Sequence, residues 1–296
     1  MNGVINVYKE KGFTSQDVVA KLRGILKQKK IGHTGTLDPD AEGVLPICVG
    51  NATKLFDILT DRTKEYETVM LLGKTTDTQD ISGSVLSESD SWKNLTEDEI
   101  TSCIMGFLPG YDQIPPMYSA LKVNGKKLYE LAREGVVVDR KPRRVDIDGI
   151  EIVSIELPRV TMRLSVSKGT YIRTICNDIG DRLSCGACME SLLRTRAGSF
   201  ELSGALRLSE IEEIRDNGKI EDIVVKVDDL FDYPRITMKE SGDKAVHNGN
   251  VFFVRDTVEE KAIKGNVLVY DSTGLFIGIY TWHNNEKRYK PFKMFL

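Results

Sequence analysis

The segment from Gly32 to Val49 reads GHTGTLDPDAEGVLPICV and places one carboxylate, Asp38, in a glycine-rich loop just before a continuous apolar run. Glycine permits backbone conformations that other residues avoid, and Pro39 biases the residue before it toward an extended conformation. The backbone around Asp38 is therefore tightly specified. A carboxylate that only solvates a surface needs no such constraint, so the loop indicates a side chain held in place for catalysis.

Two other interpretations of this segment compete with catalysis. Asp38, Asp40 and Gly43 match the start of a helix-loop-helix calcium loop, which has acids at alternate positions and glycine at the sixth. The match then fails, because Pro46 and Val49 occupy the ninth and twelfth positions and the run is too apolar for a hard cation. A plain structural turn stays open from composition alone.

The composition is that of an ordinary globular protein of 296 residues, with 41% hydrophobic and 29% charged residues. A chain of this length can bury a sizeable core, and we expect one large and one small domain. No stretch reaches the roughly 18 uninterrupted apolar residues of a membrane span, and the N-terminal sequence lacks the pattern of a signal peptide. We therefore expect a cytoplasmic protein that does not enter a membrane.

The five cysteines are scattered in apolar contexts, unlike the dense spacing of a secreted disulfide framework. Only Cys185 and Cys188 form a close pair in the sequence, and a structural zinc site needs a second pair. The three histidines are isolated from one another. We expect buried thiols and no metal site.

Charge is distributed unevenly along the chain. The net charge of −3 argues against indiscriminate binding to polyanions. Residues 122–173, however, carry twelve Lys or Arg against seven Asp or Glu, whereas residues 201–232 carry ten acids against four bases. This asymmetry is compatible with a local RNA-binding face and does not by itself establish one.

Helix and strand patterns interleave without a regular βαβ repeat. Thr14 and Asp17 form a capping-box pattern before an apolar helical repeat, and Thr96 with Glu99 repeats that pattern. Residues 160–167 alternate apolar and polar, which predicts a half-buried strand before another helix. Further strands are predicted at residues 4–7, 44–49, 66–72, 251–254, 267–270 and 275–280.

These patterns predict an α+β fold, with a mixed, mainly antiparallel sheet and flanking helices in a domain over residues 1–232. An acidic stretch ends at Asp232. After it, short strands separated by Gly and Asn turns predict a small β-barrel-like domain over residues 233–296.

The segment from Gly32 to Lys54 resembles the signature of the bacterial TruB-type tRNA pseudouridine synthases (pseudouridine synthase II family), which isomerise the T-loop uridine at tRNA position 55. The resemblance implies a catalytic domain over residues 1–232 and a PUA-type RNA-binding domain over residues 233–296. It spans nearly the whole chain, because similar pieces follow in the family's order at Lys64–Tyr66, Thr76–Thr78, Asp80, Pro115–Lys122, Lys168–Arg173, Leu192 and Arg194–Arg196.

The resemblance implies a reaction that breaks the bond between ribose C1′ and uracil N1 and rejoins the base through C5. No electron is transferred, so we expect no cofactor. Asp38 is the implied essential carboxylate, which attacks the sugar or acts on a species formed as the glycosidic bond opens. Burial alone would favour its neutral form, so a fixed cation is needed, and Arg173 is the candidate because a guanidinium can pair with a carboxylate at two points.

The resemblance also implies how the RNA is held. The target uridine has to leave its stack, at a cost that aromatic stacking in the pocket partly offsets. Tyr66 is the implied stacking platform, Tyr171 completes the pocket, and Leu192 forms its apolar wall. His33 helps to hold the flipped-out RNA and is not our choice of general base. Further candidates, for phosphate contacts, are Lys54, Lys126, Lys127, Arg143 and Arg144.

Two positions depart from the family pattern. Cys188 stands where a histidine is common, and Leu193 stands where a second arginine is common. Neither touches the expected chemistry, but both bear on how RNA docks nearby.

Three functions stay open at this point. The leading hypothesis is a monomeric, stand-alone tRNA pseudouridine synthase that recognises the T arm without an obligatory protein partner. A related RNA-guided catalytic subunit shares the central motif and would depend on partner proteins, although the chain lacks long basic tails. An RNA chaperone or binding module would use the Asp38 loop only to shape a pocket.

Overall fold

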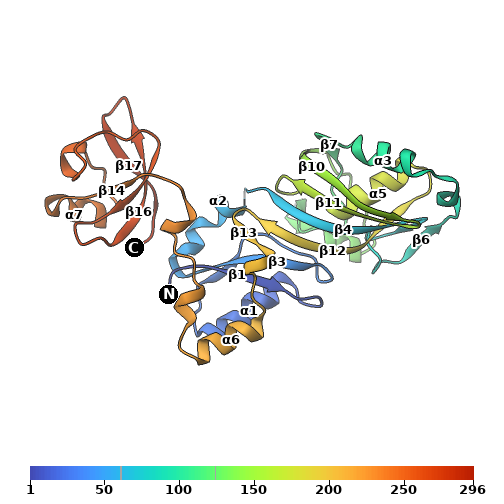
Figure 1. The fold of residues 1–296 in the computed structure, drawn as a ribbon, viewed down its shortest axis with the longest axis horizontal. Coiled ribbons are helices and arrows are strands. Elements are labelled where there is room, and N and C mark those ends of the chain that lie inside the picture. Colours follow the sequence, from blue (N-terminus) through green and yellow to red (C-terminus); the bar gives the residue numbers. More distant parts are fainter. Residues whose placement is uncertain (61, 124) are drawn as a thin grey trace.

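The larger of two main sheets organises most of the chain that the computed structural model describes, residues 1–60, 62–123 and 125–296 (Figure 1). Its strand order is β1-β3-β12-β4-β11-β10-β7, with β2 beside β3 and β13 beside β12. The strands are β1 (Gly3–Lys9), β2 (Ile31–His33), β3 (Glu42–Val49), β4 (Lys64–Leu72), β7 (Gly110–Gln113), β10 (Arg143–Glu156), β11 (Arg159–Val166), β12 (Ala187–Ala197) and β13 (Phe200–Glu201).

This sheet has a narrow seam between β3 and β12. These strands form its parallel pair, matched only at Leu193 with Glu42 and at Arg194 with Gly43, whereas the other pairs are antiparallel. Gly43 has a φ of +103°, and an added Cβ would lie 2.3 Å from the Arg194 carbonyl oxygen. The close approach therefore requires glycine. The sheet consists of two halves that β12 joins.

One core lies on the inner face of the half-sheet that contains β4. Alternate residues of β4, from Lys64 to Leu72, are buried on this face. Helices α3 and α5 pack there through apolar residues such as Ile104 and Ile175, and the core extends to Leu37 beside Asp38. A second core lies under α1 and α6, against β1 and β3. The described helices are α1 (Ser15–Leu26), α2 (Phe56–Thr60), α3 (Glu97–Met105), α4 (Leu128–Arg133), α5 (Ile172–Arg182), α6 (Leu208–Asp216) and α7 (Glu240–His247).

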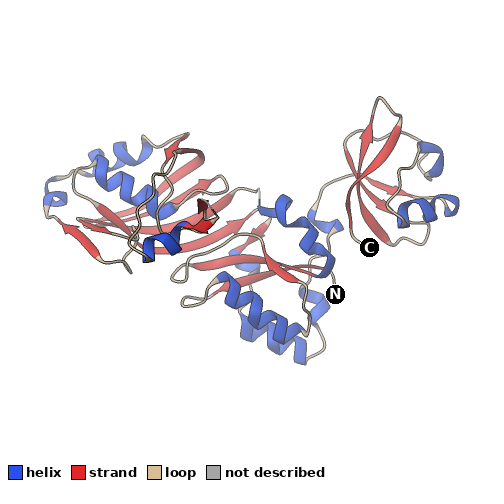
Figure 2. Cartoon of the chain, turned by 180° about the vertical axis from the view of Figure 1, so that it is seen from behind, coloured by secondary structure: helices blue, strands red, loops and turns tan. Residues whose placement is uncertain are grey.

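A smaller four-stranded sheet stands at the far end of the molecule, joined through one connecting segment (Figure 2). Its order is β14-β15-β16-β17, and α7 contributes Val246 to its own core. A further apolar cluster joins it to the larger part, because Leu268 and Phe295 pack with Val4 and Leu55. The strands are β14 (Arg235–Thr237), β15 (Asn266–Tyr270), β16 (Phe276–His283) and β17 (Arg288–Met294).

Two short hairpins lie outside the two main sheets. They are β5 (Lys74–Thr76) with β6 (Val85–Glu88), and β8 (Lys122–Val123) with β9 (Lys126–Lys127). Among the described residues, no helix is both long enough and apolar enough to cross a membrane.

The prediction of a mixed, mainly antiparallel sheet with flanking helices is confirmed. The prediction of a C-terminal β-barrel is wrong in its closure, since β14 and β17 are the two edges of an open sheet among the described residues. The expected strand at 251–254 is also absent there, because Phe252 makes a single bridge to Tyr289 and a 3₁₀ turn begins at Val254. The PUA-type assignment and the division at residue 232 stay predictions.

Candidate active site

Asp38 lies in a tight turn between β2 and β3. Its carbonyl accepts a hydrogen bond from the Ala41 amide at 3.1 Å, which closes the turn. The fully buried Lys9 donates from its ammonium to the carbonyls of Pro39, at 3.0 Å, and Ala41, at 2.6 Å. Burial lowers the pKa of Lys9 to about 8. Since β1 supplies this donor from the core, the turn is held from its inner side.

Two further side chains hold the backbone on either side of the turn. Ser15, in the first turn of α1, accepts a hydrogen bond from the Leu37 amide at 2.9 Å. The buried Arg194 of β12 donates to the Val44 carbonyl at 2.6 Å and to the Gly35 carbonyl at 3.4 Å. The loop is therefore anchored to three elements, and Asp38 has a fixed starting position.

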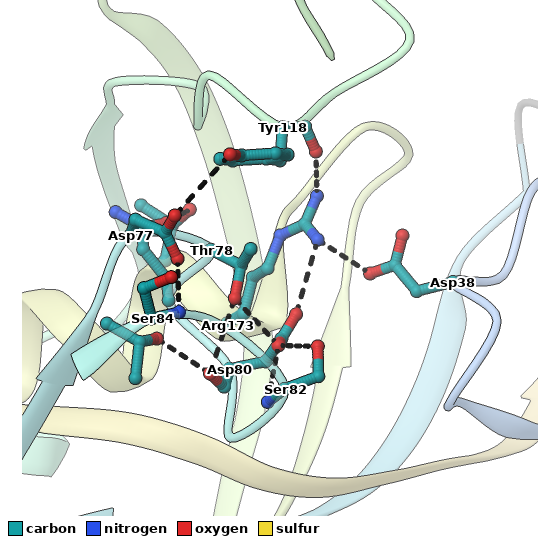
Figure 3. A network of polar contacts seen from close by, with 11 residues as sticks. Asp38, Asp77, Thr78, Asp80, Ser82, Ser84, Tyr118 and Arg173 are labelled. Atoms are coloured by element: carbon teal, nitrogen blue, oxygen red, sulfur yellow. Dashed lines mark hydrogen bonds and ion pairs between the residues drawn. The ribbon is translucent and has the colours of Figure 1, made fainter. Parts of the chain in front are cut away.

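Arg173 forms an ion pair with Asp38 across the seam. The Arg173 Nη1 atom lies 3.1 Å from Asp38 Oδ2 and 3.6 Å from Asp80 Oδ2. Figure 3 shows the guanidinium between the two carboxylates. Its Nη2 atom donates to the Tyr118 carbonyl. Arg173 is 5% exposed, whereas the Asp38 side chain keeps 38% of its surface exposed. One guanidinium thus joins two carboxylates and a loop carbonyl, with Asp38 as the more accessible acid.

Asp80 is held more firmly than Asp38. Its Oδ1 atom accepts hydrogen bonds from the Ser82 hydroxyl at 2.6 Å, the Ser82 amide at 3.0 Å and the Thr78 hydroxyl at 2.8 Å. Nearby, Tyr118 donates from its hydroxyl to Asp77 at 3.4 Å, and these groups surround the Arg173 side chain (Figure 3). Asp80 is therefore suited to hold the guanidinium, while Asp38 has an oxygen left for a ligand.

The Asp38 environment shifts its protonation. Burial raises the pKa of Asp38 above its ordinary value of 3.8, and the Arg173 cation opposes that rise. Asp80 raises the pKa further and Lys9 lowers it. A carboxylate with a raised pKa is a stronger base and a better nucleophile than one in water, provided that a cation keeps it ionised.

A cleft of about 860 Å³ opens beside the ion pair, within the range of about 300 to 1,000 Å³ typical of small-ligand sites. Asp38, Tyr66, Tyr171, Arg173 and Leu192 all line it, so these five predicted residues meet in one place. Tyr66 is 7% exposed on the inner face of β4, and Tyr171 precedes α5 as its N-cap. Burial raises the pKa of the Tyr171 hydroxyl. The cleft can accept a planar base between aromatic and apolar walls.

His33 and Lys54 lie away from these residues. His33 is half-buried in β2, and burial lowers its pKa, which favours the neutral imidazole. Lys54 donates from its ammonium to the Met294 carbonyl at 2.8 Å and so ties the chain's end to the larger part. A phosphate contact of Lys54 stays a prediction, and it would compete with this hydrogen bond.

None of the other four predicted phosphate contacts lines the described cleft. Lys126 and Lys127 form β9 beside α4, whose Arg133 lines the cleft. Arg143 and Arg144 begin β10 and are exposed. Their roles in RNA binding stay predictions.

Sequence reasoning gave no role to Lys9, Asp80 or Arg194. Asp80 lies within the family resemblance, but the sequence does not show that it lies close to Arg173. Arg194 also lies within the resemblance, which gives it no role, and Lys9 lies just beyond the strand predicted at residues 4–7. Only the contacts that their side chains make inside the fold reveal their support of the Asp38 loop.

Comparison with known protein families gives two matches that adjoin along the chain. The model described as TruB family pseudouridylate synthase (N terminal domain) matches residues 23–172. The model described as tRNA pseudouridylate synthase B C-terminal domain matches residues 173–232. Asp38 and Tyr66 fall within the first, and Arg173 begins the second.

Comparison with individual proteins also gives members of this family. The chain is 53% identical to tRNA pseudouridine synthase B of Lachnoclostridium phytofermentans, with 100% of both chains covered. It is 44% identical to the protein of the same name from Clostridium perfringens, with 100% of this chain and 99% of the other covered. Among solved structures, a chain in the crystal structure of a Cbf5-Nop10-Gar1 complex is similar at 27% identity and a TM-score of 0.73, covering 99% of this chain and 85% of that one.

Proposed function

The chain belongs to the TruB family of tRNA pseudouridine synthases, and we propose that it isomerises the uridine at position 55, in the T loop of tRNA, with Asp38 as its essential carboxylate. The relatives named tRNA pseudouridine synthase B match it from end to end, so formation of pseudouridine in tRNA is its reaction. The position in tRNA and the roles of individual residues are our proposal.

One observation carries the proposal. The Asp38–Arg173 ion pair lies in the same cleft as Tyr66 and Tyr171. An ionised carboxylate next to an aromatic wall is the arrangement that this reaction needs, because the base must be held while its bond to the sugar is broken. No single one of these residues would support the same conclusion.

We propose that the uridine flips out of the T loop and that its base stacks on Tyr66. The bond between C1′ and N1 breaks, the base turns, and a bond forms between C1′ and C5. The hydrogen on C5 then leaves as a proton and N1 gains one, so atoms and electrons balance without a redox step. Tyr171 and Leu192 keep the detached base in the cleft during its rotation.

Two roles of Asp38 fit this geometry. It attacks C1′ and holds the sugar covalently while the base turns, as the nucleophile of a retaining glycosidase does. Alternatively, it acts as a base on a species formed when the glycosidic bond opens. Both need the ionised form, and Arg173 favours that form.

RNA outside the cleft needs its own contacts. We propose that residues 233–296 form an RNA-binding domain that grips the tRNA beyond the T loop, and that His33 helps to hold the flipped-out bases. Lys126, Lys127, Arg143 and Arg144 are proposed to contact phosphates around the cleft. We further propose that the protein acts as a monomer in the cytoplasm, without an obligatory protein partner.

The test is a comparison of wild type with Asp38→Asn on an unmodified tRNA transcript. Pseudouridine is mapped by chemical labelling, and tRNA affinity is measured in parallel. We expect modification at the T-loop uridine by wild type alone, with similar tRNA binding by both proteins. Residual turnover of the variant within about tenfold of wild type would rule out the essential role, since loss of a catalytic carboxylate costs far more than this.

The same assay separates the proposed function from both alternatives, because it contains no guide RNA and no partner protein. Tight tRNA binding by wild type without any modification would favour a partner-dependent subunit, as in the structurally similar Cbf5 complex, or an RNA chaperone.

A further inference from the structure

A buried glutamine connects the edge of the sheet to the active-site helix. Gln113 ends β7, and it is 1% exposed. Its Oε1 atom accepts a hydrogen bond from the Tyr171 amide at 2.9 Å, and its Nε2 atom donates to the Tyr171 carbonyl at 3.1 Å. Nε2 also donates to the Tyr111 hydroxyl at 2.8 Å. One side chain thus pairs with both backbone groups of one residue, as a neighbouring strand would.

The orientation of this amide is fixed by its partners. If it were turned over, its NH₂ group would face the Tyr171 N–H and its oxygen would face the Tyr171 carbonyl. The Tyr111 hydroxyl donates to Asp178 at 2.6 Å, so it accepts from Gln113. A glutamine has the donors and the acceptor that this position requires, whereas an apolar side chain of equal size has neither.

The start of α5 depends on this contact. Tyr171 is the N-cap residue, and its own side chain makes no capping hydrogen bond. The first amides of a helix lack partners within the helix, so the start of a helix needs hydrogen-bond partners from outside it. Gln113 binds the Tyr171 amide from outside and so fixes the position from which the helix begins.

Arg173 lies two residues beyond this point. Its guanidinium reaches Asp38 at 3.1 Å, and it also donates to the carbonyl of Tyr118. Tyr118 follows Gln113 by five residues in the same connecting segment. The segment therefore holds the first turn of α5 twice, once through Gln113 on the backbone and once through the Tyr118 carbonyl on the arginine.

We propose that Gln113 is a positioning residue for pseudouridine formation, whose carboxamide sets the start of α5 and thereby places Arg173 against Asp38 and the Tyr171 ring in the cleft. This rests on the function proposed above. Gln113 does not line the described cleft and makes no contact with the expected substrate position. Its effect passes through the two residues that do, and a shift of about 1 Å in a catalytic group can cost about a hundredfold in rate.

The first test compares Gln113→Leu with wild type in a single-turnover assay on tRNA transcript carrying tritium at uridine C5, which is released as the new bond forms. We expect the rate constant to fall about tenfold or more, while the tRNA dissociation constant stays within about threefold. Tyr111→Phe is the matched control, because it removes the neighbouring hydroxyl and leaves both contacts to Tyr171 in place. We expect that control to keep the wild-type rate within about threefold.

The pH dependence of the rate constant provides a second test, because it would not change if Gln113 only stabilised the fold. Asp38 is faced by Arg173 from α5, by Lys9 from β1, and by Asp80 and Asp40 from loops. If Arg173 is displaced, ionisation of Asp38 becomes harder, and the acid limb of the rate should move to higher pH by about one pH unit in Gln113→Leu. Tyr111→Phe should keep the wild-type limb.

An acid limb at the wild-type pH in Gln113→Leu, or an equal rate loss in Tyr111→Phe, would overturn the proposal. Should Gln113→Leu fail to fold, Gln113→Asn keeps the amide but is one methylene too short to span both groups of Tyr171, and the same shift is expected of it. Wild-type modification of tRNA in the same assay confirms the function independently, so failure of this proposal is separable from failure of that one.

Discussion

Replacement of Arg173 by methionine tests the electrostatic basis of the site directly. Methionine has a similar length and no charge, so it leaves Asp38 and Asp80 without the cation that now lies 3.1 and 3.6 Å from them. Asp80 retains its hydrogen bonds from Ser82 and Thr78. Asp38 has fewer alternatives, so most of the effect should fall on its protonation.

The magnitude follows from the distance. An opposite charge within about 4 to 6 Å lowers the pKa of a carboxyl group by about 1 to 3. Burial already raises the pKa of Asp38, so removal of Arg173 should raise that pKa further by about this amount. The acid limb of the rate should move upward by about 1 to 3 pH units, and part of the lost activity should return at alkaline pH.

The same shift has a defined effect on stability. The pKa of Asp38 is higher in the folded state than its ordinary value of 3.8. Between pH 3.8 and the folded-state pKa, the folded protein therefore binds more protons than the unfolded chain. The contribution of Asp38 to the free energy of unfolding falls as pH rises through this window. In Arg173→Met this pH window extends to higher pH, because the folded-state pKa of Asp38 rises further. We expect a loss of about 2 kcal/mol at neutral pH, below the roughly 3 to 5 kcal/mol of a fully buried pair, because Asp38 opens to the cleft.

The assay is tritium release under single-turnover conditions between pH 5 and 10, with unfolding followed by calorimetry. Arg173→Lys is the control, because it keeps the charge but cannot reach both carboxylates and the Tyr118 carbonyl at once. We expect its acid limb to lie between those of wild type and Arg173→Met. An Arg173→Met variant whose rate falls equally at every pH would refute the electrostatic reasoning.

Substitutions at three further positions have defined outcomes. Lys9→Met removes the donor to two loop carbonyls, and its tritium-release rate should fall about tenfold or more; a wild-type rate would exclude support of the loop by Lys9. Tyr66→Phe should keep kcat/KM within about threefold, whereas Tyr66→Ala should lose the roughly 1 to 3 kcal/mol of base stacking; equal values for both would contradict stacking. Gly43→Ala should destabilise the fold by about 2 kcal/mol or more in calorimetry, because its φ is +103° and the added Cβ meets the Arg194 carbonyl; an unchanged Tm would argue against the tight seam.

The local parts of the fold were accessible from the sequence. The capping box at Thr14 and Asp17 marks the start of α1, and the one at Thr96 and Glu99 marks the start of α3. Alternation over residues 160–167 corresponds to β11. These signals depend on hydrogen bonds and burial within a few residues, so no distant part of the chain can override them easily.

Long-range pairing was not accessible in this way. Nothing near Ala187 to Ala197 predicts that this strand inserts between β3 and β4, since that depends on partners far along the chain. The strands predicted at residues 267–270 and 275–280 correspond to β15 and β16. The local sequence pattern does not determine whether the C-terminal strands close into a barrel. Closure depends on whether the first and last strands meet, and here they remain edges among the described residues.

The residues of the site also fall into those that the sequence indicates and those that only the structure reveals. Asp38 stood out because its loop has unusual local composition, and the family resemblance supplied Arg173 and Tyr66. The resemblance includes Arg194 without a role for it, and Lys9 lies just beyond the strand predicted at residues 4–7. Here each charge turns inward to satisfy backbone carbonyls, and only the packed structure shows it.

The central place of β12 determines when during synthesis the site can be completed. Asp38 precedes β3 in one half-sheet, and Arg173 lies in the first turn of α5, the helix that packs against the other half-sheet. A nascent chain that ends before Ala187 contains both residues but lacks the strand between β3 and β4, and it lacks Arg194, which anchors the Asp38 loop. Until β12 has been synthesised, the two half-sheets of the larger sheet are not joined to each other. The site is therefore complete only in a chain that includes β12, although both members of the ion pair precede that strand.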